Sequence, residues 1–249
     1  TQIAVDTGVG SRAVAATHYE VLFSYGTRIG APDCSIPDAG RRWLPARPVV
    51  ATSLWDVEPG QPDAPVGALL HWAAGSDVEY RGRVYGHKDR EFTRVVDAPA
   101  RMPRRRFALA LGGGNGQRSF LRDAGWELGD PLDATRTIEA YQSFVRDCWA
   151  DLGVAKHAYV SSRSGWFSDR STCFLASGRP VLHQDTGYTD WLDVDDGVIP
   201  FSDLESLVEA LERLEADYEL HASAARRIAE EHFEARAVIG DMLDEAGFR

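Results

Sequence analysis

The segment that most constrains the fold runs from residue 157 to residue 187 and alternates short apolar runs with glycine turns. Residues 157–162 alternate and carry β-formers, whereas residues 167–177 suit a short helix that stops at Gly178. Residues 180–184 form a compact apolar run, as a buried strand does. The pattern therefore predicts a strand, a helix and a second strand, which together make one βαβ unit.

The two loops of this unit are the first candidates for a functional site. A right-handed βαβ crossover brings the loops that follow its strands to the carboxyl edge of the sheet. We therefore expect residues 164–168 and residues 185–187 to lie side by side on that edge. Ligands of open parallel sheets bind there.

The chain from residue 66 onward alternates apolar runs with amphipathic runs. This alternation predicts a doubly wound parallel α/β sheet over residues 66–233, with a C-terminal helix over residues 234–249 that crosses back to the N-terminal part. A capping box of Ser202 and Glu205 is expected to start the helix that follows the last strand. The expected strands are 66–72, 107–111, 126–128 and 198–201, and the expected helices are 90–96, 119–124, 138–152, 218–232 and 235–245.

Residues 1–65 contain too few elements for a complete α/β domain. Short strands are expected at residues 3–6, 19–25 and 48–51, with one short helix possible at residues 12–19. We therefore interpret residues 1–65 as a partial N-terminal region.

Composition and charge exclude several classes of protein. A formal charge of −11 disfavours a nucleic-acid or anionic-membrane surface, because phosphates would be repelled. The basic run at residues 101–106 is an exception that suits either a phosphate site or, with more weight, a solvated loop. Cys34, Cys148 and Cys173 have no disulfide or metal-like spacing. No apolar run has the roughly 20 residues of a membrane span, so a cytoplasmic protein is expected.

The run SGWFSDR at residues 164–170 has the composition of an anion site. A glycine precedes a helix whose free N–H groups and positive dipole end, with the Arg170 guanidinium, predict a diphosphate cradle. An equally weighted interpretation is that Ser168 only caps its helix and that Asp169 only balances the helix dipole. GGGNG at residues 112–116 is a second candidate loop, although a flexible turn explains it better. The GxGxxG and GxxxxGK[ST] patterns are absent.

These residues carry a resemblance. The run SGWFSDRSTCFLASGRPVLHQDTG, followed by an acidic helix and by YELHASAARRIAEEHF, resembles the C-terminal, donor-binding half of GT-B fold glycosyltransferases. It is similar to a bacterial group of glycosyltransferase-like proteins in which SGWFSDRS, LASGRPV and QDTG recur in that order. VYGHKDREF at residues 84–92 and the run at residues 30–48 also resemble that group. The resemblance implies a Rossmann-like domain and the transfer of a sugar from a nucleotide-diphosphate donor to an acceptor.

The resemblance also implies site residues. The donor phosphates or ribose would contact Ser164, Gly165, Trp166, Ser168, Asp169 and Arg170, and the donor sugar would contact Gln184, Asp185, Thr186 and Gly187. Lys88 is a candidate for neutralising the leaving diphosphate, with a plain surface lysine as the alternative. We expect no metal ion and no cofactor, because the acidic turn with Asp193, Asp195 and Asp196 suits a solvated loop.

The sequence also departs from the GT-B pattern. Many retaining GT-B enzymes carry two glutamates eight residues apart around the helix expected at residues 167–177, whereas here no acid lies between Asp169 and Asp185. A general base from the acceptor side, such as His18, competes with a structural role for that histidine. Two other functions therefore stay open, a non-catalytic nucleotide-sugar-binding module and a sugar-nucleotide epimerase.

Overall fold

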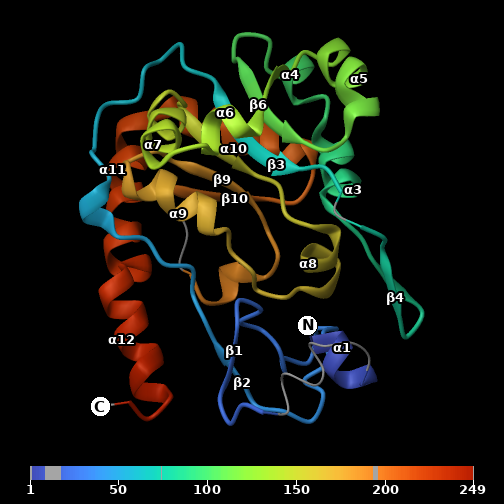
Figure 1. Ribbon diagram of the computed structural model, residues 1–249. Helices are drawn as coiled ribbons and strands as arrows, with labels where there is room; N and C mark the ends of the chain where they lie inside the picture. Colours follow the sequence, from blue (N-terminus) through green and yellow to red (C-terminus); the bar gives the residue numbers. More distant parts are fainter. Residues whose placement is uncertain (1, 9–17, 74, 193–195, 249) are drawn as a thin grey trace.

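The computed structural model describes residues 2–8, 18–73, 75–192 and 196–248, and its centre is a six-stranded parallel sheet (Figure 1). The spatial order β7-β6-β3-β8-β9-β10 places the first strand in the middle, with later strands added on one side and then on the other. This is the doubly wound arrangement that the alternating sequence predicts. The strands are β3 (Val66–His71), β6 (Phe107–Gly112), β7 (Glu127–Gly129), β8 (Ala150–Gly153), β9 (Val181–Gln184) and β10 (Val198–Phe201).

The order of the strands reverses at β3, and the pairing is weak there. β3 pairs with β6 along its whole length, but it pairs with β8 only at Val66–Ala150 and Gly67–Asp151. The carboxyl halves of β3 and β8 therefore separate. In open α/β sheets this point is where a crevice opens at the carboxyl edge.

One face of the sheet is covered by helices that pack on the apolar side chains of β3, β6 and β10. These helices are α3 (Lys88–Phe92), η2 (Thr93–Val95), α4 (Ala98–Arg101) and α10 (Leu204–Ala216). Helix α5 (Arg118–Asp123), preceded by η3 (Asn115–Gln117), packs beside β7. Leu207, Leu211 and Leu214 of α10 follow the i, i+4, i+7 spacing and are fully buried, so the apolar stripe of α10 sets its orientation.

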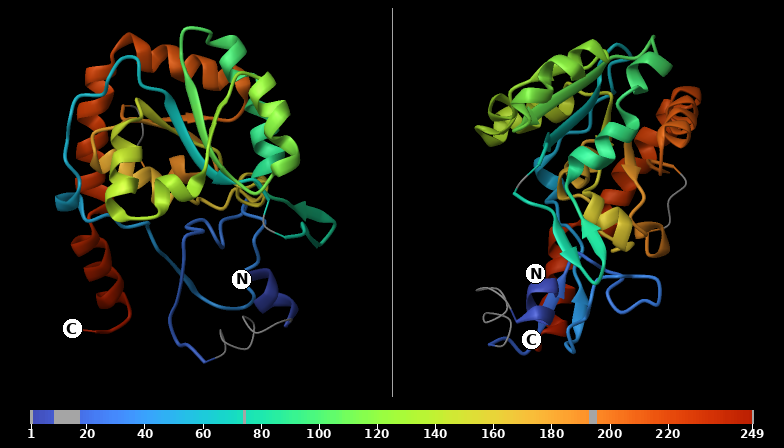
Figure 2. Two further views of the ribbon diagram at one scale, coloured as in Figure 1. Left: turned by 45° about the horizontal axis from the view of Figure 1, so that its top comes forward. Right: turned by 90° about the vertical axis from the view of Figure 1, so that its right-hand side faces the viewer.

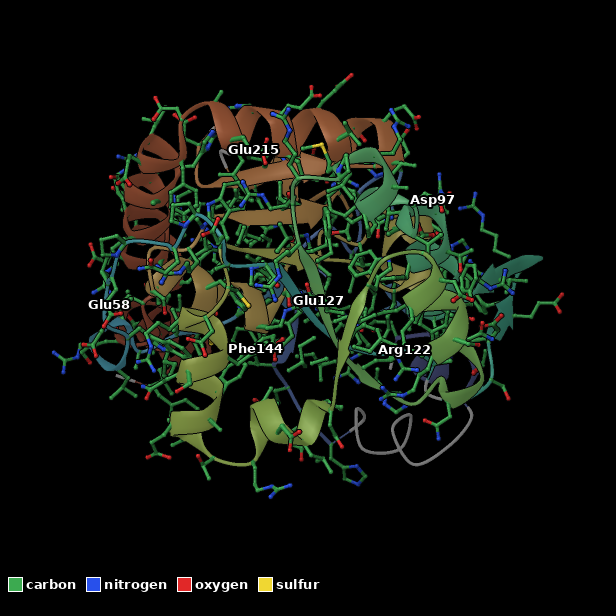
Figure 3. The ribbon with its side chains drawn as sticks, turned by 90° about the horizontal axis from the view of Figure 1, so that it is seen from above. Glu58, Asp97, Arg122, Glu127, Phe144 and Glu215 are labelled. Atoms are coloured by element: carbon green, nitrogen blue, oxygen red, sulfur yellow. The ribbon has the colours of Figure 1, made fainter. Side chains whose placement is uncertain are left out.

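The opposite face is covered by α7 (Ile138–Arg146), α9 (Asp169–Ala176) and α11 (Tyr218–Ile228), which continues into the π-helical turn η5 (Ala229–Phe233). Phe167 and Phe233 stack there with ring centroids 5.2 Å apart. Helix α6 (Pro131–Thr135) precedes α7 and contacts β6. In Figure 3, which looks from above, Phe144 of α7 and Glu215 of α10 lie on opposite sides of the sheet.

The N-terminal segment lies outside the sheet, below α8 (His157–Ser162) in Figure 1. It contains α1 (Gln2–Thr7) and a parallel pair of short strands, β1 (Leu22–Ser24) and β2 (Trp43–Pro45). The final helix α12 (Ala235–Glu245) runs down beside this segment, and an apolar hollow lined by β1, β2 and α12 lies between them.

Short elements complete the chain. The antiparallel hairpin of β4 (Val78–Tyr80) and β5 (Arg83–Tyr85) projects away from the sheet (Figure 2). The 3₁₀ turns η1 (Thr52–Leu54) and η4 (Tyr188–Asp190) follow the N-terminal segment and β9 respectively. Among the described residues, no helix combines the length and the apolar character that crossing a bilayer requires.

Two of the expected strands are wrong, because both segments are helices in the structure. Residues 157–162 form helix α8, whose first amides donate to the carbonyls of Gly86 and His87, and whose end is fixed by Arg163 at φ 50°. Residues 3–6 belong to helix α1. The expected strand at residues 48–51 is reduced to one bridge between Val50 and Glu234.

The expected helix at residues 138–152 is wrong in its second half. Helix α7 ends at Arg146, and Ala150–Gly153 is the buried strand β8. Asp151 interrupts the apolar run and conceals this strand from pattern analysis, although it is fully buried. The βαβ unit at the centre of the sequence therefore runs from β8 through α8 and α9 to β9.

The other expected elements are found, with small shifts of their ends. The capping box before α10 is formed by Asp203 and Ser206 instead of Ser202 and Glu205, because the helix begins at Leu204. The short helix expected at residues 12–19 falls largely outside the described residues.

Candidate functional site

A cavity of about 900 Å³ lies where β3 and β8 separate, and we call it the switch-point cavity. The carboxyl end of β3, the start of α3, the start of α9 and the turn before α7 all contribute to it. Its volume lies within the usual range of small-molecule sites, roughly 300–1,000 Å³. Its lining comprises Val49, Trp55, Leu69, Leu70, His71, Lys88, Thr135, Arg136, Thr137, Ile138, Tyr141, Trp166, Ser168, Asp169, Arg170 and Cys173.

The start of α9 contributes polar groups to this cavity. Ser168 occupies the N-cap position, but its hydroxyl makes no capping bond, and no other partner is found in the described part of the chain. The residue is only 3% exposed, and it lines the cavity. The first amides of a helix have no intrahelical acceptor, and the helix dipole places positive charge there. The Arg170 amide already donates to the Asp169 carboxylate at 3.0 Å. The groups that converge on this point are therefore the Ser168 hydroxyl, the other amides of the first turn and the positive end of the dipole.

Lys88 adds a titratable cation to the same cavity. The side chain is half-buried at the start of α3, and burial, followed by repulsion from Arg170, lowers the pKa of Lys88 to about 7. A neutral and a charged form therefore coexist near pH 7 in the unliganded protein. A bound anion would favour the charged form.

Arg170 is held by the protein itself, which the sequence did not indicate. Its Nε and Nη2 atoms donate to the two carboxylate oxygens of Asp151, at 3.0 and 3.2 Å. Nη1 donates to the Leu69 carbonyl at 2.6 Å, and Nη2 also donates to the Leu152 carbonyl at 3.2 Å. Arg170 therefore fills the split between β3 and β8. Of the five N–H groups of a guanidinium, one on Nη1 is left for a ligand.

The cavity also has an apolar side. Trp55 and Tyr141 meet edge to face with their ring centroids 5.8 Å apart, and Ile138 is 69% exposed beside them. A flat heterocycle packs well against such side chains. Sequence analysis missed this part of the site, because Trp55 and Tyr141 come from segments more than 80 residues apart.

The two glycine turns predicted from the central unit do lie side by side. The Gly165 amide donates to the Thr186 carbonyl at 2.8 Å, and the Thr186 hydroxyl donates to the Trp166 carbonyl at 2.5 Å. The Gly187 amide donates to the Asp185 carboxylate at 2.8 Å. The Gly165 and Gly187 amides, which a phosphate would need, are therefore both occupied. The glycine amides therefore belong to the packing of the loops.

The N-terminal segment also covers both turns. Thr27 donates from its hydroxyl to the Gly165 carbonyl at 3.0 Å, and the Arg28 amide donates to the Ser164 carbonyl at 3.0 Å. A Cβ atom added at Gly165 would lie 2.7 Å from Cγ of Arg28, and one at Gly187 would lie 2.9 Å from its Cδ. Thr27 and Arg28 thus occupy the space above both glycines. The expected contacts of Gly165 with phosphate or ribose and of Gly187 with the donor sugar stay predictions.

The residues proposed for the donor sugar have partners within the protein. The side chain of Gln184 accepts from the Ala155 amide at 3.2 Å and donates to the Glu91 carboxylate at 2.6 Å. Neither Gln184 nor any residue of 185–187 lines the switch-point cavity. Contact between these residues and a sugar stays a prediction. Of the residues proposed for phosphate or ribose, Trp166, Ser168, Asp169 and Arg170 do line the cavity, whereas Ser164 and Gly165 do not.

The remaining candidates lie elsewhere. His18 is exposed and does not line the cavity, and residues 112–116 are also absent from its lining. Asp196 lies 3.1 Å from Arg213, while Asp193 and Asp195 fall outside the described residues. No group of three or more acidic, histidine or cysteine side chains among the described residues is arranged to hold a metal ion.

The basic run at residues 101–106 forms ion pairs. Arg101 pairs with Glu205, Arg105 with Glu215 and Arg106 with Glu127. Two of these acids, Glu127 and Glu215, are labelled in Figure 3. These pairs neutralise three of the four arginines of the run within the protein, which supports the interpretation of the run as a solvated loop.

Comparison with known proteins places this fold. No protein-family model matches the sequence, and no curated protein matches it significantly. Solved structures of GT-B glycosyltransferases do match. Anabaena HepE in complex with UDP and glucose gives a TM-score of 0.63 at 12% identity, covering 99% of this chain and 67% of its own. Sucrose-phosphate synthase from Thermosynechococcus elongatus gives 0.57 at 15% identity, covering 98% and 66%.

A third match is S. aureus TarM in a complex that includes UDP, with a TM-score of 0.56 at 11% identity. It covers 97% of this chain and 48% of the TarM chain, so the present chain spans from 48% to 67% of the length of these three structures. Identities of 11–15% establish the fold alone. The chain therefore has a Rossmann-like, GT-B glycosyltransferase-like fold, with a cavity of about 900 Å³ at the switch point of the parallel sheet.

Proposed function

We propose that the chain binds a nucleotide-diphosphate sugar in the switch-point cavity and transfers the sugar to an acceptor hydroxyl. The observation that carries the proposal is the Ser168 hydroxyl at the start of α9, which makes no capping bond, on a residue that lines the same cavity as Lys88. Both groups suit a diphosphate. The GT-B-like fold supports the assignment, since structures of this fold with UDP bound are among the matches.

The two sides of the cavity match the two halves of such a donor. The diphosphate would lie against the start of α9 and Lys88, and the nucleobase against Trp55 and Tyr141. Asp169 and Trp166 line the cavity beside the phosphate position. They are therefore placed to contact the ribose or the sugar.

The chemistry requires positive charge at the leaving group. In the transfer, the bond between the anomeric carbon and the diphosphate oxygen breaks, and its electron pair stays on the diphosphate. The acceptor oxygen bonds to that carbon, and its proton passes to the departing diphosphate. Negative charge grows on the diphosphate as its bond breaks. Protonated Lys88 and the dipole of α9 stabilise that charge, so we propose a transfer that needs no metal ion.

Calorimetric titration with UDP, GDP, dTDP and their glucose conjugates tests the donor assignment. Ser168→Ala and Lys88→Met should each raise the Kd of the bound nucleotide about tenfold, because a hydrogen bond to a charged group contributes roughly 1.5–3 kcal/mol. Lys156→Met is the charge-matched control, since Lys156 is the other lysine of the chain and lies outside the cavity lining. Unchanged affinity in both cavity variants would refute the assignment.

The fate of the bound donor then separates the functions. Slow hydrolysis of the sugar, insensitive to EDTA, is the result expected of a metal-independent transferase without its acceptor. Interconversion of donor sugars would instead indicate an epimerase, and binding without any turnover would indicate a binding module.

A further inference from the structure

A second cavity of about 350 Å³ lies between the N-terminal segment and the loop that follows α8, and we call it the aromatic cavity. Five aromatic residues and a few small polar ones surround it. Its lining comprises Gln2, Phe23, Ser24, Tyr25, Gly26, Ile36, Trp43, Tyr159, Ser164 and Trp166. The views in Figures 1 and 2 both place the N-terminal segment against the part of the chain that contains α8.

The lining selects an uncharged ligand with an apolar face. None of the described residues that line the aromatic cavity carries a charge, whereas the switch-point cavity contains Lys88, Asp169 and two arginines. Tyr159 and Trp166 form one wall, with ring centroids 4.9 Å apart and a tilt of 33°. Aromatic faces pack against the C–H groups of a ring. A sugar ring offers such a face and is neutral.

Hydrogen-bonding capacity is available at the edge of the cavity. The Ser24 hydroxyl oxygen accepts from the Gln2 side-chain amide at 2.8 Å and from the Gly26 amide at 3.0 Å. Its own proton is therefore left to donate to a ligand. Tyr25 is 47% exposed, which leaves the cavity open to solvent on that side. A cavity with aromatic faces and hydroxyl edges suits the hydroxyl groups that surround a sugar ring.

The aromatic cavity lies next to the proposed donor site. Trp166 lines both cavities, so one indole ring separates them. A transferase needs its acceptor next to its donor, because the acceptor oxygen must reach the anomeric carbon. The N-terminal segment supplies seven of the ten lining residues, namely Gln2, Phe23, Ser24, Tyr25, Gly26, Ile36 and Trp43.

We propose that the aromatic cavity binds a saccharide ring of the acceptor, so that the substrate class that receives the sugar is itself a carbohydrate. This inference rests on the proposed function for its acceptor role. The saccharide site itself rests on the lining of the cavity. The sugar stacks on Trp43, Tyr159 and Trp166 and receives a hydrogen bond from Ser24.

Binding of sugars without nucleotide is the direct test. The probes are methyl glycosides of glucose, galactose and N-acetylglucosamine, with maltose as a longer probe, followed by saturation-transfer NMR on the full chain. Trp43→Ala and Tyr25→Ala should weaken sugar binding about tenfold, the loss expected for an aromatic contact of roughly 1.4 kcal/mol. Tyr19→Ala is the matched control, because Tyr19 is 62% exposed and lies outside both linings.

UDP titration of the same variants separates this inference from the proposed function. The expected result is unchanged UDP affinity in Trp43→Ala and Tyr25→Ala together with weakened sugar binding. UDP binding without any sugar binding, or sugar binding that neither variant weakens, overturns the saccharide site and leaves the donor site standing. A third outcome is that sugars bind, both variants weaken that binding, and UDP does not bind. This outcome overturns the proposed function and the acceptor role together. If no sugar binds but 4-methylumbelliferone binds tightly, the cavity selects flat aromatic alcohols. That result also overturns the inference.

Discussion

Replacing Arg170 by methionine should destabilise the protein more than it affects any ligand. Arg170 is the cation that pairs with the fully buried carboxylate of Asp151, and it also bonds the carbonyls of Leu69 and Leu152 across the split between β3 and β8. Breaking a buried ion pair by removing one partner costs roughly 3–5 kcal/mol, since a buried charge is left uncompensated. Methionine keeps the apolar stem, so the loss of packing adds little. Against a typical stability of about 5–15 kcal/mol, this loss is large.

Urea unfolding at pH 7, followed by tryptophan fluorescence, measures the effect in Arg170→Met, Asp151→Asn and the double variant. The double variant should be less destabilised than the sum of the single variants by about 1–3 kcal/mol, because Asp151→Asn removes the charge that Arg170 compensates. If Arg170→Met costs less than about 1 kcal/mol and the two changes are additive, then Arg170 does not join the strands as described here. UDP titration of Arg170→Met under folding conditions measures separately whether the remaining N–H contacts phosphate.

Three further predictions concern other parts of the structure. UDP affinity should be full below pH 7 and fall by up to about tenfold per pH unit as the pH rises above 7, because the pKa of free Lys88 is about 7 and bound diphosphate raises it. Calorimetry at a series of pH values measures this, and Lys88→Met should show a flat profile. A flat profile in the unmodified protein would contradict the assignment. Gly165→Val should displace Thr27 and the segment around it, and limited proteolysis would detect that displacement. If UDP binding is lost while the segment is undisturbed, then Gly165 contacts the phosphates as the sequence suggests. Gly67→Ala should cost about 1–3 kcal/mol in urea unfolding, because the new methyl group collides with the Cys148 sulfur, and Cys148→Ala should recover part of the loss; no recovery would place the strain elsewhere.

Local sequence signals predicted those elements whose residues agree with their surroundings. Helix α12 has the predicted ends, and β9 and β10 lie within a residue of their predicted positions. Gly178 ends its helix at φ 68°, where a glycine is favoured. The helix expected after Gly165 is found as α9, which begins at Asp169 with Ser168 at its N-cap position.

Prediction failed where a distant partner changes what a residue can do. Asp151 sits in a central buried strand only because Arg170, 19 residues later, neutralises it. The alternation at residues 157–162 suggested a strand, yet the carbonyls of Gly86 and His87 fix the first turn of a helix there. The aromatic side of the switch-point cavity combines Trp55 with Tyr141, and no sequence pattern links them.

Hydrophobic periodicity predicted the parallel α/β architecture from the sequence, because it acts over neighbouring residues. The two glycine turns do meet, although residues 157–162, expected as the strand before the first turn, form helix α8. The surroundings of those turns are set by tertiary contacts. Thr27 and Arg28 come from far along the chain to cover them, while Ser168 and Lys88 line the switch-point cavity. The physical reason is that a ligand site depends on which polar groups remain unpaired after folding, and long-range contacts decide that pairing.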